Sequence, residues 1–197
     1  YHQLGRTISN QKINGYNASL NVSHTFKIQH KPEKEHELLL TLGGEIISGT
    51  TNRSNSNTTN TFIHYYPTSH IFSGYMDYFY AGGRNVAGVG LIDGYLRTKY
   101  TFANKAFISL NTHFFNTYAN TYDLGTDERL DNYLGVETDL TLGYVLSPSA
   151  SLQAGYSHMF GSNTLNYVQT GNMSPMKGVQ NWAYLMVIIR PNNNRKF

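Results

Sequence analysis

The sequence predicts an all-β fold, specifically an antiparallel up-and-down transmembrane β-barrel. Long segments alternate between apolar and polar residues, as strands with one apolar and one wet face do. Short connections alternate with long ones rich in Asn, Thr, Ser and Gly. The sequence has no run of about 18 apolar residues, which excludes a membrane-spanning helix. A transmembrane barrel escapes that test because half of each strand faces water.

The clearest alternation runs over Gly15–Gln29, GYNASLNVSHTFKIQ. Its odd positions are polar, whereas its even positions hold Tyr16, Ala18, Leu20, Val22, His24, Phe26 and Ile28. At about 3.3 Å per residue this stretch extends to roughly 50 Å. Strands of soluble domains usually reach about 17–20 Å. A long two-faced strand therefore favours a wall with lipid on one side and water on the other.

Six further segments are predicted strands: His36–Gly49, Val89–Phe102, Ala106–Tyr118, Tyr133–Leu146, Ser151–Gly161 and Trp182–Arg190. Within Tyr133–Leu146 the alternation places Leu134 on the apolar outward face. Trp182–Arg190 is apolar on both faces, so its faces are not assigned, and a strand buried on both sides in a soluble core is the alternative. The start of the chain, YHQLGRTI, supplies a short eighth strand. No helix is predicted.

The connections divide into two kinds. His30–Glu35, Ala103–Lys105 and SPSA are short turns, and residues 50–88, 119–132 and 162–180 are predicted long extracellular loops. Ile71–Tyr80, IFSGYMDYFY, resembles a strand, but a spanning strand there would break the up-and-down order. We therefore place it in the first long loop, either folded into the barrel mouth or extending outward as a hairpin. Residues 1–197 form one barrel domain or the C-terminal portion of one.

Composition narrows the function classes. Cysteine is absent, so disulfides and thiolate metal sites are excluded. The net charge of +3 is too small to indicate a nucleic-acid partner. Ser109, His113 and Asp139 can be aligned as a triad on paper, but no nucleophile elbow is present. No HExxH motif occurs either. We therefore predict no enzyme, no metal and no cofactor.

The polar face supplies the candidate lumen-lining residues Lys27, Glu45, Asp93, Arg97, Lys99, Asn111, His113, Glu137 and Asp139. Arg97 and Lys99 are the candidates for contact with anions, but a salt-bridge ladder with carboxylates on neighbouring strands is the interpretation that we favour for them. Tyrosines near strand ends form a candidate aromatic girdle at the membrane interface. These are Tyr16, Tyr100, Tyr144, Tyr156 and Tyr184.

Several blocks together resemble a known family: YHQLGR, LTLGGEIISGT, FSGYMDYFYAGG, LGVETDLTLGYVLSPSASLQAGYSHMF and QNWAYLMVIIRP. They look like the C-terminal half of the alginate-export-like outer-membrane proteins of Bacteroidota. The resemblance implies a barrel of about 16–18 strands, of which this chain supplies about seven or eight. It also implies passive export or diffusion of solutes and location in the bacterial outer membrane.

A porin-like channel for polar solutes, including saccharides, is therefore the leading expectation. Its partners would be lipid, lipopolysaccharide and other outer-membrane proteins. The inward charges do not select alginate, because an exporter of a polyanion should have a basic lining. Here Lys27, Arg97 and Lys99 face an acidic set of Glu37, Glu45, Asp93, Glu137 and Asp139. A structural barrel without an open pore and a soluble ligand-binding β-barrel are the alternatives.

Overall fold

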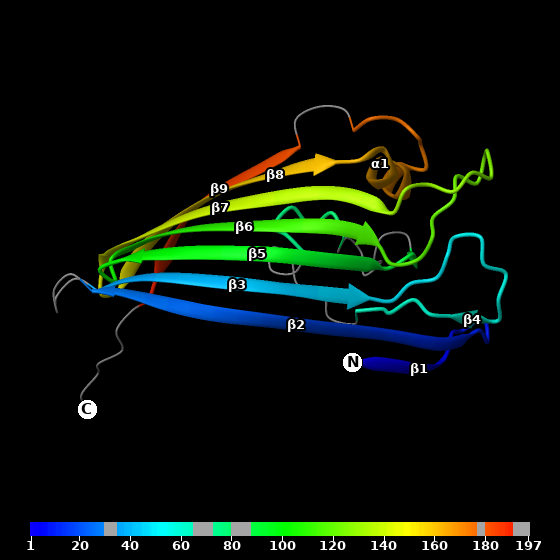
Figure 1. Cartoon of the computed structure of the whole chain (residues 1–197), viewed down its shortest axis with the longest axis horizontal. Helices are drawn as coiled ribbons and strands as arrows, with labels where there is room; N and C mark the ends of the chain where they lie inside the picture. Colours follow the sequence, from blue (N-terminus) through cyan, green and yellow to red (C-terminus); the bar gives the residue numbers. More distant parts are fainter. Residues whose placement is uncertain (30–34, 65–72, 80–87, 177–179, 191–197) are drawn as a thin grey trace.

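The computed structural model describes residues 1–29, 35–64, 73–79, 88–176 and 180–190 as one curved sheet with a short helix (Figure 1). The strands are β1 (His2–Arg6), β2 (Lys12–Gln29), β3 (Glu35–Ile47), β4 (Thr58–Thr59), β5 (Leu91–Phe102), β6 (Ala106–Thr117), β7 (Tyr133–Ser147), β8 (Ala150–Gly161) and β9 (Asn181–Ile189). The helix is α1 (Asn163–Thr170). All seven predicted long strands and the short N-terminal one are present, with ends shifted by at most a few residues.

The strands follow one another across a single sheet in the order β1-β2-β3-β5-β6-β7-β8-β9. Every neighbouring pair in that order is antiparallel, and only β4 pairs parallel, with β2. The predicted all-β antiparallel fold is therefore confirmed. Among the described residues no ladder joins β1 to β9, so closure into a barrel stays a prediction.

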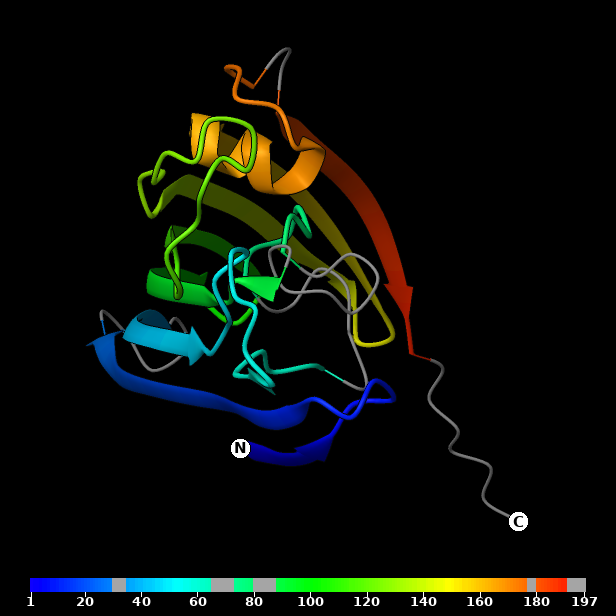
Figure 2. The ribbon, with the colours of Figure 1, turned by 90° about the vertical axis from the view of Figure 1, so that its right-hand side faces the viewer.

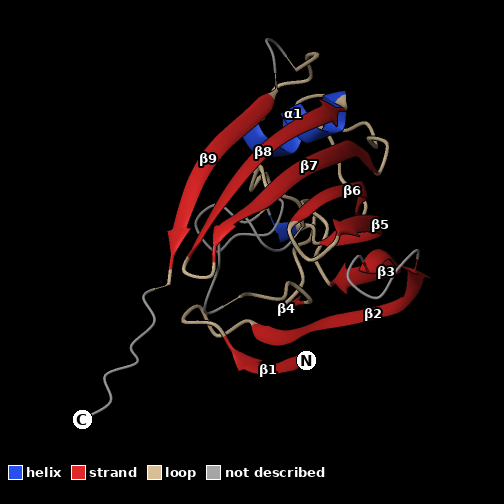
Figure 3. Cartoon of the chain, turned by 90° about the vertical axis from the view of Figure 1, so that its left-hand side faces the viewer, coloured by secondary structure: helices blue, strands red, loops and turns tan. Residues whose placement is uncertain are grey.

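The sheet is bent into a trough, which is clearest when viewed along the strands (Figures 2 and 3). The short connections β5–β6 and β7–β8 lie at one end of the trough, and the long connections and the short β1–β2 turn lie at the other (Figure 1). The helix α1 and the described parts of the long connections lie on the concave side (Figure 3). We call the two ends the short-turn end and the long-loop end.

One short turn shows why the chain reverses there. Lys105 N donates to Phe102 O over 2.8 Å, and the two central residues, Ala103 and Asn104, have φ values of 45° and 54°. Two successive positive φ angles define a type I′ turn, whose twist matches that of the flanking strands. The predicted turn at Ala103–Lys105 is thus present, whereas most of the predicted turn at His30–Glu35 lies outside the described residues.

The convex face is apolar and uncovered. Leu20 is 76% exposed, Leu42 67% and Leu185 73%. Other exposed convex side chains are Val22, Ile46, Ile92, Leu96, Phe102, Ile108, Leu110, Phe114, Leu142, Phe160, Val187 and Ile189. A continuous apolar face of this kind marks a membrane or protein interaction surface. The period-two pattern therefore corresponds to apolar side chains on the outer, convex face of the sheet and polar side chains on the inner, concave face.

Register settles the faces of β9. Trp182 is opposite Ser157 and Tyr184 is opposite Gly155, both on the concave face. The alternate residues, including Leu185 and Ile189, consequently point to the convex side and are exposed. This strand is apolar on both faces, but its convex face is exposed, so the expectation that it could be buried on both sides is wrong.

Leu134 departs from the predicted alternation. Phe115 pairs with Gly135 and Asn116 with Tyr133, so Leu134 is an extra residue between two pairs. Such a β-bulge shifts the parity of the strand. As a result Leu134 points inward and is fully buried, not outward as its position in the alternating pattern predicts.

The helix α1 was not predicted, and that expectation of a helix-free chain is wrong. The Ser162 hydroxyl accepts from Leu165 N over 3.2 Å, which caps the first turn. At the other end Gly171 has a φ of 76°, and its N–H donates to Tyr167 O over 2.7 Å. A Ser and a Gly nine residues apart were the available signal, in a loop too short for clear periodicity.

No helix in the described part of the chain is long and apolar enough to cross a membrane.

Candidate functional site: the polar concave surface

Ladder register brings polar side chains from successive strands into rows across the concave face. One row contains Tyr95, His113 and Glu137; the next contains Arg97, Asn111 and Asp139. By the same register all nine candidate lumen-lining residues lie on this face: Lys27, Glu45, Asp93, Arg97, Lys99, Asn111, His113, Glu137 and Asp139. The face assignment follows from period-two patterning alone.

A buried pair joins β5 and β6. His113 Nδ1 lies 2.9 Å and 3.0 Å from the two carboxylate oxygens of Asp93. Each side chain is 2% exposed. A carboxylate only accepts, so Nδ1 carries the proton and donates. The imidazole also stacks on Phe115, with ring centroids 5.6 Å apart and planes at 15°. The pair is a fixed polar element of the wall.

Residues 73–79 lie against the concave face. Met76 N donates to the carboxylate of Glu137 over 2.9 Å, and Glu137 is fully buried. The ring of Phe79 packs on that of Phe115 with centroids 4.3 Å apart. The described part of Ile71–Tyr80 therefore forms no strand and supports the alternative in which it folds inward. Residues 71, 72 and 80 lie outside the described residues.

Backbone conformation shapes this segment so that it reaches Glu137. Ser73, Gly74 and Asp77 have φ values of 53°, 86° and 57°. A Cβ on Gly74 would overlap the Glu137 carboxyl group. Glycine at position 74 therefore allows both the left-handed conformation and the close approach. Tyr78 adds a second attachment, because its hydroxyl donates to the side chain of Gln180.

Tyr75 covers the polar row beside Glu137. Its nearest electrostatic neighbours include Thr141, Asp139 and Tyr184, and burial raises the pKa of the Tyr75 phenol. Beneath it the Asp139 side chain is fully buried, and no donor among the described residues bonds to its carboxylate oxygens. In the same part of the chain, the hydroxyl of Ser157, opposite Asp139 on β8, is also buried without a partner. This part of the wall thus has unused acceptor capacity.

Three aromatic rings lie flat against the concave wall, each over a glycine directly opposite on the next strand. The pairs are Tyr95 with Gly43, Phe107 with Gly143 and Tyr184 with Gly155. In each case a Cβ on the glycine would overlap the ring. Sequence reasoning missed these pairs, because a glycine and an aromatic residue become partners only once the register is known.

Two of these rings carry a cation. Arg97 Cζ lies 4.1 Å from the centroid of Tyr95, and Lys99 Nζ lies 4.5 Å from that of Phe107. Within the described residues neither cation forms an ion pair, so the salt-bridge-ladder interpretation is not what the structure shows. Contact of Arg97 and Lys99 with anions remains a prediction.

The remaining charged candidates lie at the margins. Lys27 is exposed near the short-turn end, opposite Glu37 in the ladder. Glu45 lies nearer the long-loop end, where it accepts from Asn17 Nδ2 over 2.7 Å. The described part of the concave face therefore carries charged residues of both signs.

The candidate girdle tyrosines fall into three groups. Tyr100 and Tyr144 lie on the convex face near the short-turn end, and Tyr100 OH lies 3.1 Å from His36 Nδ1. Tyr16 lies near the long-loop end, where its hydroxyl meets that of Tyr118 at 2.9 Å. Tyr156 is convex but halfway along β8.

Tyr184 corrects the girdle prediction, because its ring lies on the concave face over Gly155. Its phenolic oxygen accepts from Gln153 Nε2, another concave residue. The double-sided apolarity of β9 concealed this orientation from sequence reasoning.

The long-loop end of the trough is filled by a hydrophobic cluster. Its buried members are Ile47, Phe62, Phe79, Val89, Leu91, Phe115, Leu134, Met159 and Leu165. They come from the ends of the strands, from the described parts of the connection between β4 and β5, and from α1. The long connections are thus part of a packed core that narrows the concave side at this end.

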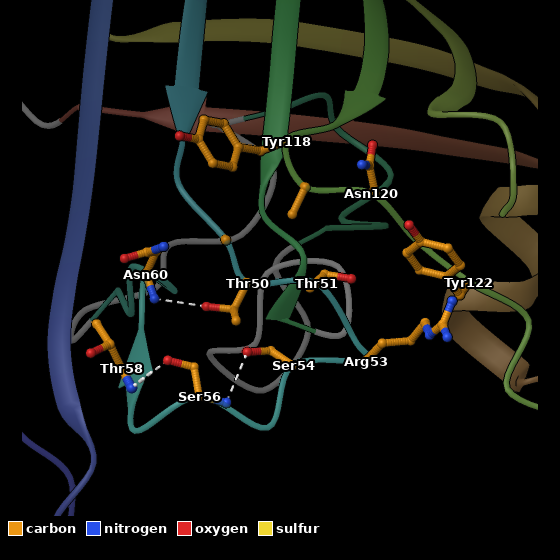
Figure 4. Close-up of a pocket in the computed structure, with 12 residues that line it drawn as sticks. Thr50, Thr51, Arg53, Ser54, Ser56, Thr58, Asn60, Tyr118, Asn120 and Tyr122 are labelled. Atoms are coloured by element: carbon orange, nitrogen blue, oxygen red, sulfur yellow. Dashed lines mark hydrogen bonds between the residues drawn. The ribbon is translucent and has the colours of Figure 1, made fainter. Parts of the chain in front are cut away.

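A polar cavity of about 500 Å³ opens among the same connections (Figure 4). Several of its hydroxyl groups accept hydrogen bonds from nearby backbone N–H groups. Thr50 Oγ1, for example, accepts from Asn60 N over 2.7 Å. Arg53 lies at one side, 2.9 Å from Asp127 and 4.5 Å above the ring of Tyr122. These bonds brace the loops against one another, and we assign this cavity no ligand.

Among the described residues no group of His, Cys, Asp and Glu side chains could hold a metal ion. Comparison with protein-family models, curated proteins and solved structures gives no match for the chain. The functional argument consequently rests on the geometry of the two faces.

Proposed function

We propose that this chain forms part of the wall of a porin-like channel for polar solutes in a bacterial outer membrane. One observation carries the proposal: the sheet is apolar and bare on its convex face, and polar and charged on its concave face. Lipid is the medium that covers an apolar face of this extent without a protein partner, and water is the medium that suits the charged one.

A soluble ligand-binding barrel is the alternative that this polarity disfavours. Such a barrel holds apolar side chains inside and polar ones outside. Here Asp93, Glu137 and Asp139 are inside, whereas Leu20 and Leu185 are outside. In a membrane the edges at β1 and β9 require strand partners, because unpaired backbone groups are costly in lipid. The proposal therefore includes further strands that close the barrel.

A structural barrel without an open pore is the second candidate. The hydrophobic cluster at the long-loop end and residues 73–79 on the concave wall are the observations that favour it. The channel proposal instead assigns residues 73–79 to a constriction beside Arg97, Glu137 and Asp139. Both candidates share the membrane location and differ in conduction.

The experiment examines membrane insertion first and conduction second. Full-length protein is extracted from membranes and run on SDS gels with and without heating, then reconstituted in planar lipid bilayers. We expect extraction only with detergent, heat-modifiable migration and discrete single-channel conductance. Insertion without conductance would favour the structural barrel. Extraction into plain buffer would overturn the membrane location and the channel together.

A further inference from the structure

A cavity of about 470 Å³ lies at the β9 edge of the sheet, beside residues 73–79, which we call the inserted segment. It is lined by Tyr75, Gln153, Trp182, Tyr184, Leu185 and Met186. Tyr75 comes from residues 73–79, Gln153 from β8 and the others from β9. Three aromatic side chains thus surround one space on the concave wall, beside the buried row that contains Asp139.

The two rings on β9 are held in place. The Tyr184 ring lies over Gly155, and its phenolic oxygen accepts from Gln153 Nε2. The Trp182 ring centroid is 4.9 Å from that of Tyr184, with the planes at 34°. Packing and the hydrogen bond therefore fix this pair before any ligand arrives, which lowers the entropy cost of binding.

Comparison of the three flat rings indicates what the cavity accepts. Arg97 covers Tyr95 and Lys99 covers Phe107. Among the described residues no cation lies over Tyr184. An aromatic face attracts cations through its quadrupole, and several rings around one space form the cage that recognises quaternary ammonium groups.

The charges nearby also favour a cation. After the larger effect of burial, the negative charge of Asp139 raises the pKa of the Tyr75 phenol and the positive charge of Arg97 lowers it. Asp139 is fully buried and lies in the same row of the sheet as Trp182, with Ser157 between them. Buried carboxylates act over a longer range than exposed ones because little water screens them.

We propose that Tyr75, Trp182 and Tyr184 form an aromatic cage that binds a small organic ammonium ion. The inference deepens the proposed function, because it names a class of solute that the concave wall recognises. It rests on that function only in requiring the concave face to be accessible to water. Binding is therefore measured separately from conduction.

Trp182 is the only tryptophan among the 197 residues, so the part of the fluorescence change that is lost in a Trp182→Phe variant reports on the cage. Detergent-solubilised protein is titrated with choline chloride, with 3,3-dimethylbutan-1-ol as the uncharged isostere and with maltose. We expect a saturable fluorescence change with choline alone. Saturation by the uncharged alcohol at equal concentration would overturn the cationic assignment. Saturation by maltose without choline would instead make the cavity a sugar site.

Variants test the residues. Tyr184→Leu should weaken choline binding about tenfold, the loss expected from one desolvated cation–π contact. Asp139→Asn should weaken it several-fold with the rings unchanged, and Tyr184→Phe should retain most binding because it keeps the ring. Tyr156→Leu on the convex face is the matched control and should have no effect.

One result would overturn the cage: Tyr184→Leu and Asp139→Asn, both with intact heat-modifiable migration, each bind choline with the affinity of the natural protein. Choline binding without conductance would support the cage and overturn the channel proposal. Conductance without choline binding would support the channel and overturn the cage.

Discussion

The amide nitrogen of Met76 lies 2.9 Å from a carboxylate oxygen of Glu137, although the two residues are 61 positions apart. This bond attaches residues 73–79 to the concave face of β7, in the third of the strand nearer the long-loop end. Glu137 is fully buried, so water does not replace the bond when it is lost. Glu137 therefore holds the N-terminal half of residues 73–79, while the packing of Phe79 on Phe115 and the bond from Tyr78 to Gln180 hold the C-terminal half.

We predict that Glu137→Ala releases the inserted segment while the sheet stays intact. The Met76 amide would lose its acceptor, at a cost of about 1–3 kcal/mol. That cost corresponds to a rise of about 10- to 100-fold in amide exchange at Met76. Hydrogen–deuterium exchange of peptides from residues 73–79 measures it. Glu137→Gln keeps an acceptor oxygen and should retain protection. Identical exchange in the alanine variant and the natural protein would contradict this role.

We expect Gly74→Ala to displace the same segment from the other side of the contact. Gly74 has a φ of 86°, and a Cβ there would overlap the Glu137 carboxyl group. The left-handed conformation alone costs alanine about 1–2 kcal/mol. Gly94→Ala is the matched control, because a Cβ at this strand glycine meets no atom within 4 Å. Faster exchange at residues 73–79 in Gly74→Ala but not in Gly94→Ala is the expected result, and equal exchange would count against it.

The alternation of apolar and polar residues predicts most of the strands of this fold, but it predicts the candidate site only in part. Period-two alternation placed Lys27, Asp93 and Glu137 on one face because each strand residue must point to one side or the other. The cover over Glu137 comes from residues 73–79, whose sequence has no periodicity, and Lys27 stays exposed. The difference matters for Asp139, which the pattern predicts as a lining residue and the structure buries beneath Tyr75.

Register accounts for the other departures. Leu134 changes face because a bulge adds one residue to β7, and no residue type announces a bulge reliably. Tyr184 becomes concave because it is opposite Gly155, a relationship between strands that one strand cannot reveal. The helix α1 had capping residues in the sequence, at Ser162 and Gly171, and these were a usable signal.

The Asp93–His113 pair should behave as a buried unit. His113→Ala leaves the Asp93 carboxylate without its donor, so we expect a loss of about 3–5 kcal/mol in the free energy of unfolding. The double variant Asp93→Leu, His113→Phe removes both polar groups and should recover most of that loss. Denaturation in detergent, followed by the heat-modifiable gel band, measures both. Additive losses in the double variant would show that the two residues act independently.

The orientation of the wall is tested by two neighbours on β2 that point to opposite faces. Val22 is convex and 70% exposed, whereas Asn21 is concave and also exposed. Arginine on a lipid-facing position near the bilayer centre costs about 2–4 kcal/mol, and arginine on a water-filled face costs little. We therefore expect Val22→Arg to lower the stability of the protein refolded into lipid vesicles by that amount, and Asn21→Arg to leave it nearly unchanged. Because the two positions are adjacent, local chain effects are shared and the difference isolates the medium outside each face. Equal losses at both positions would mean that lipid does not contact the convex side, and the reverse order would place lipid on the concave side.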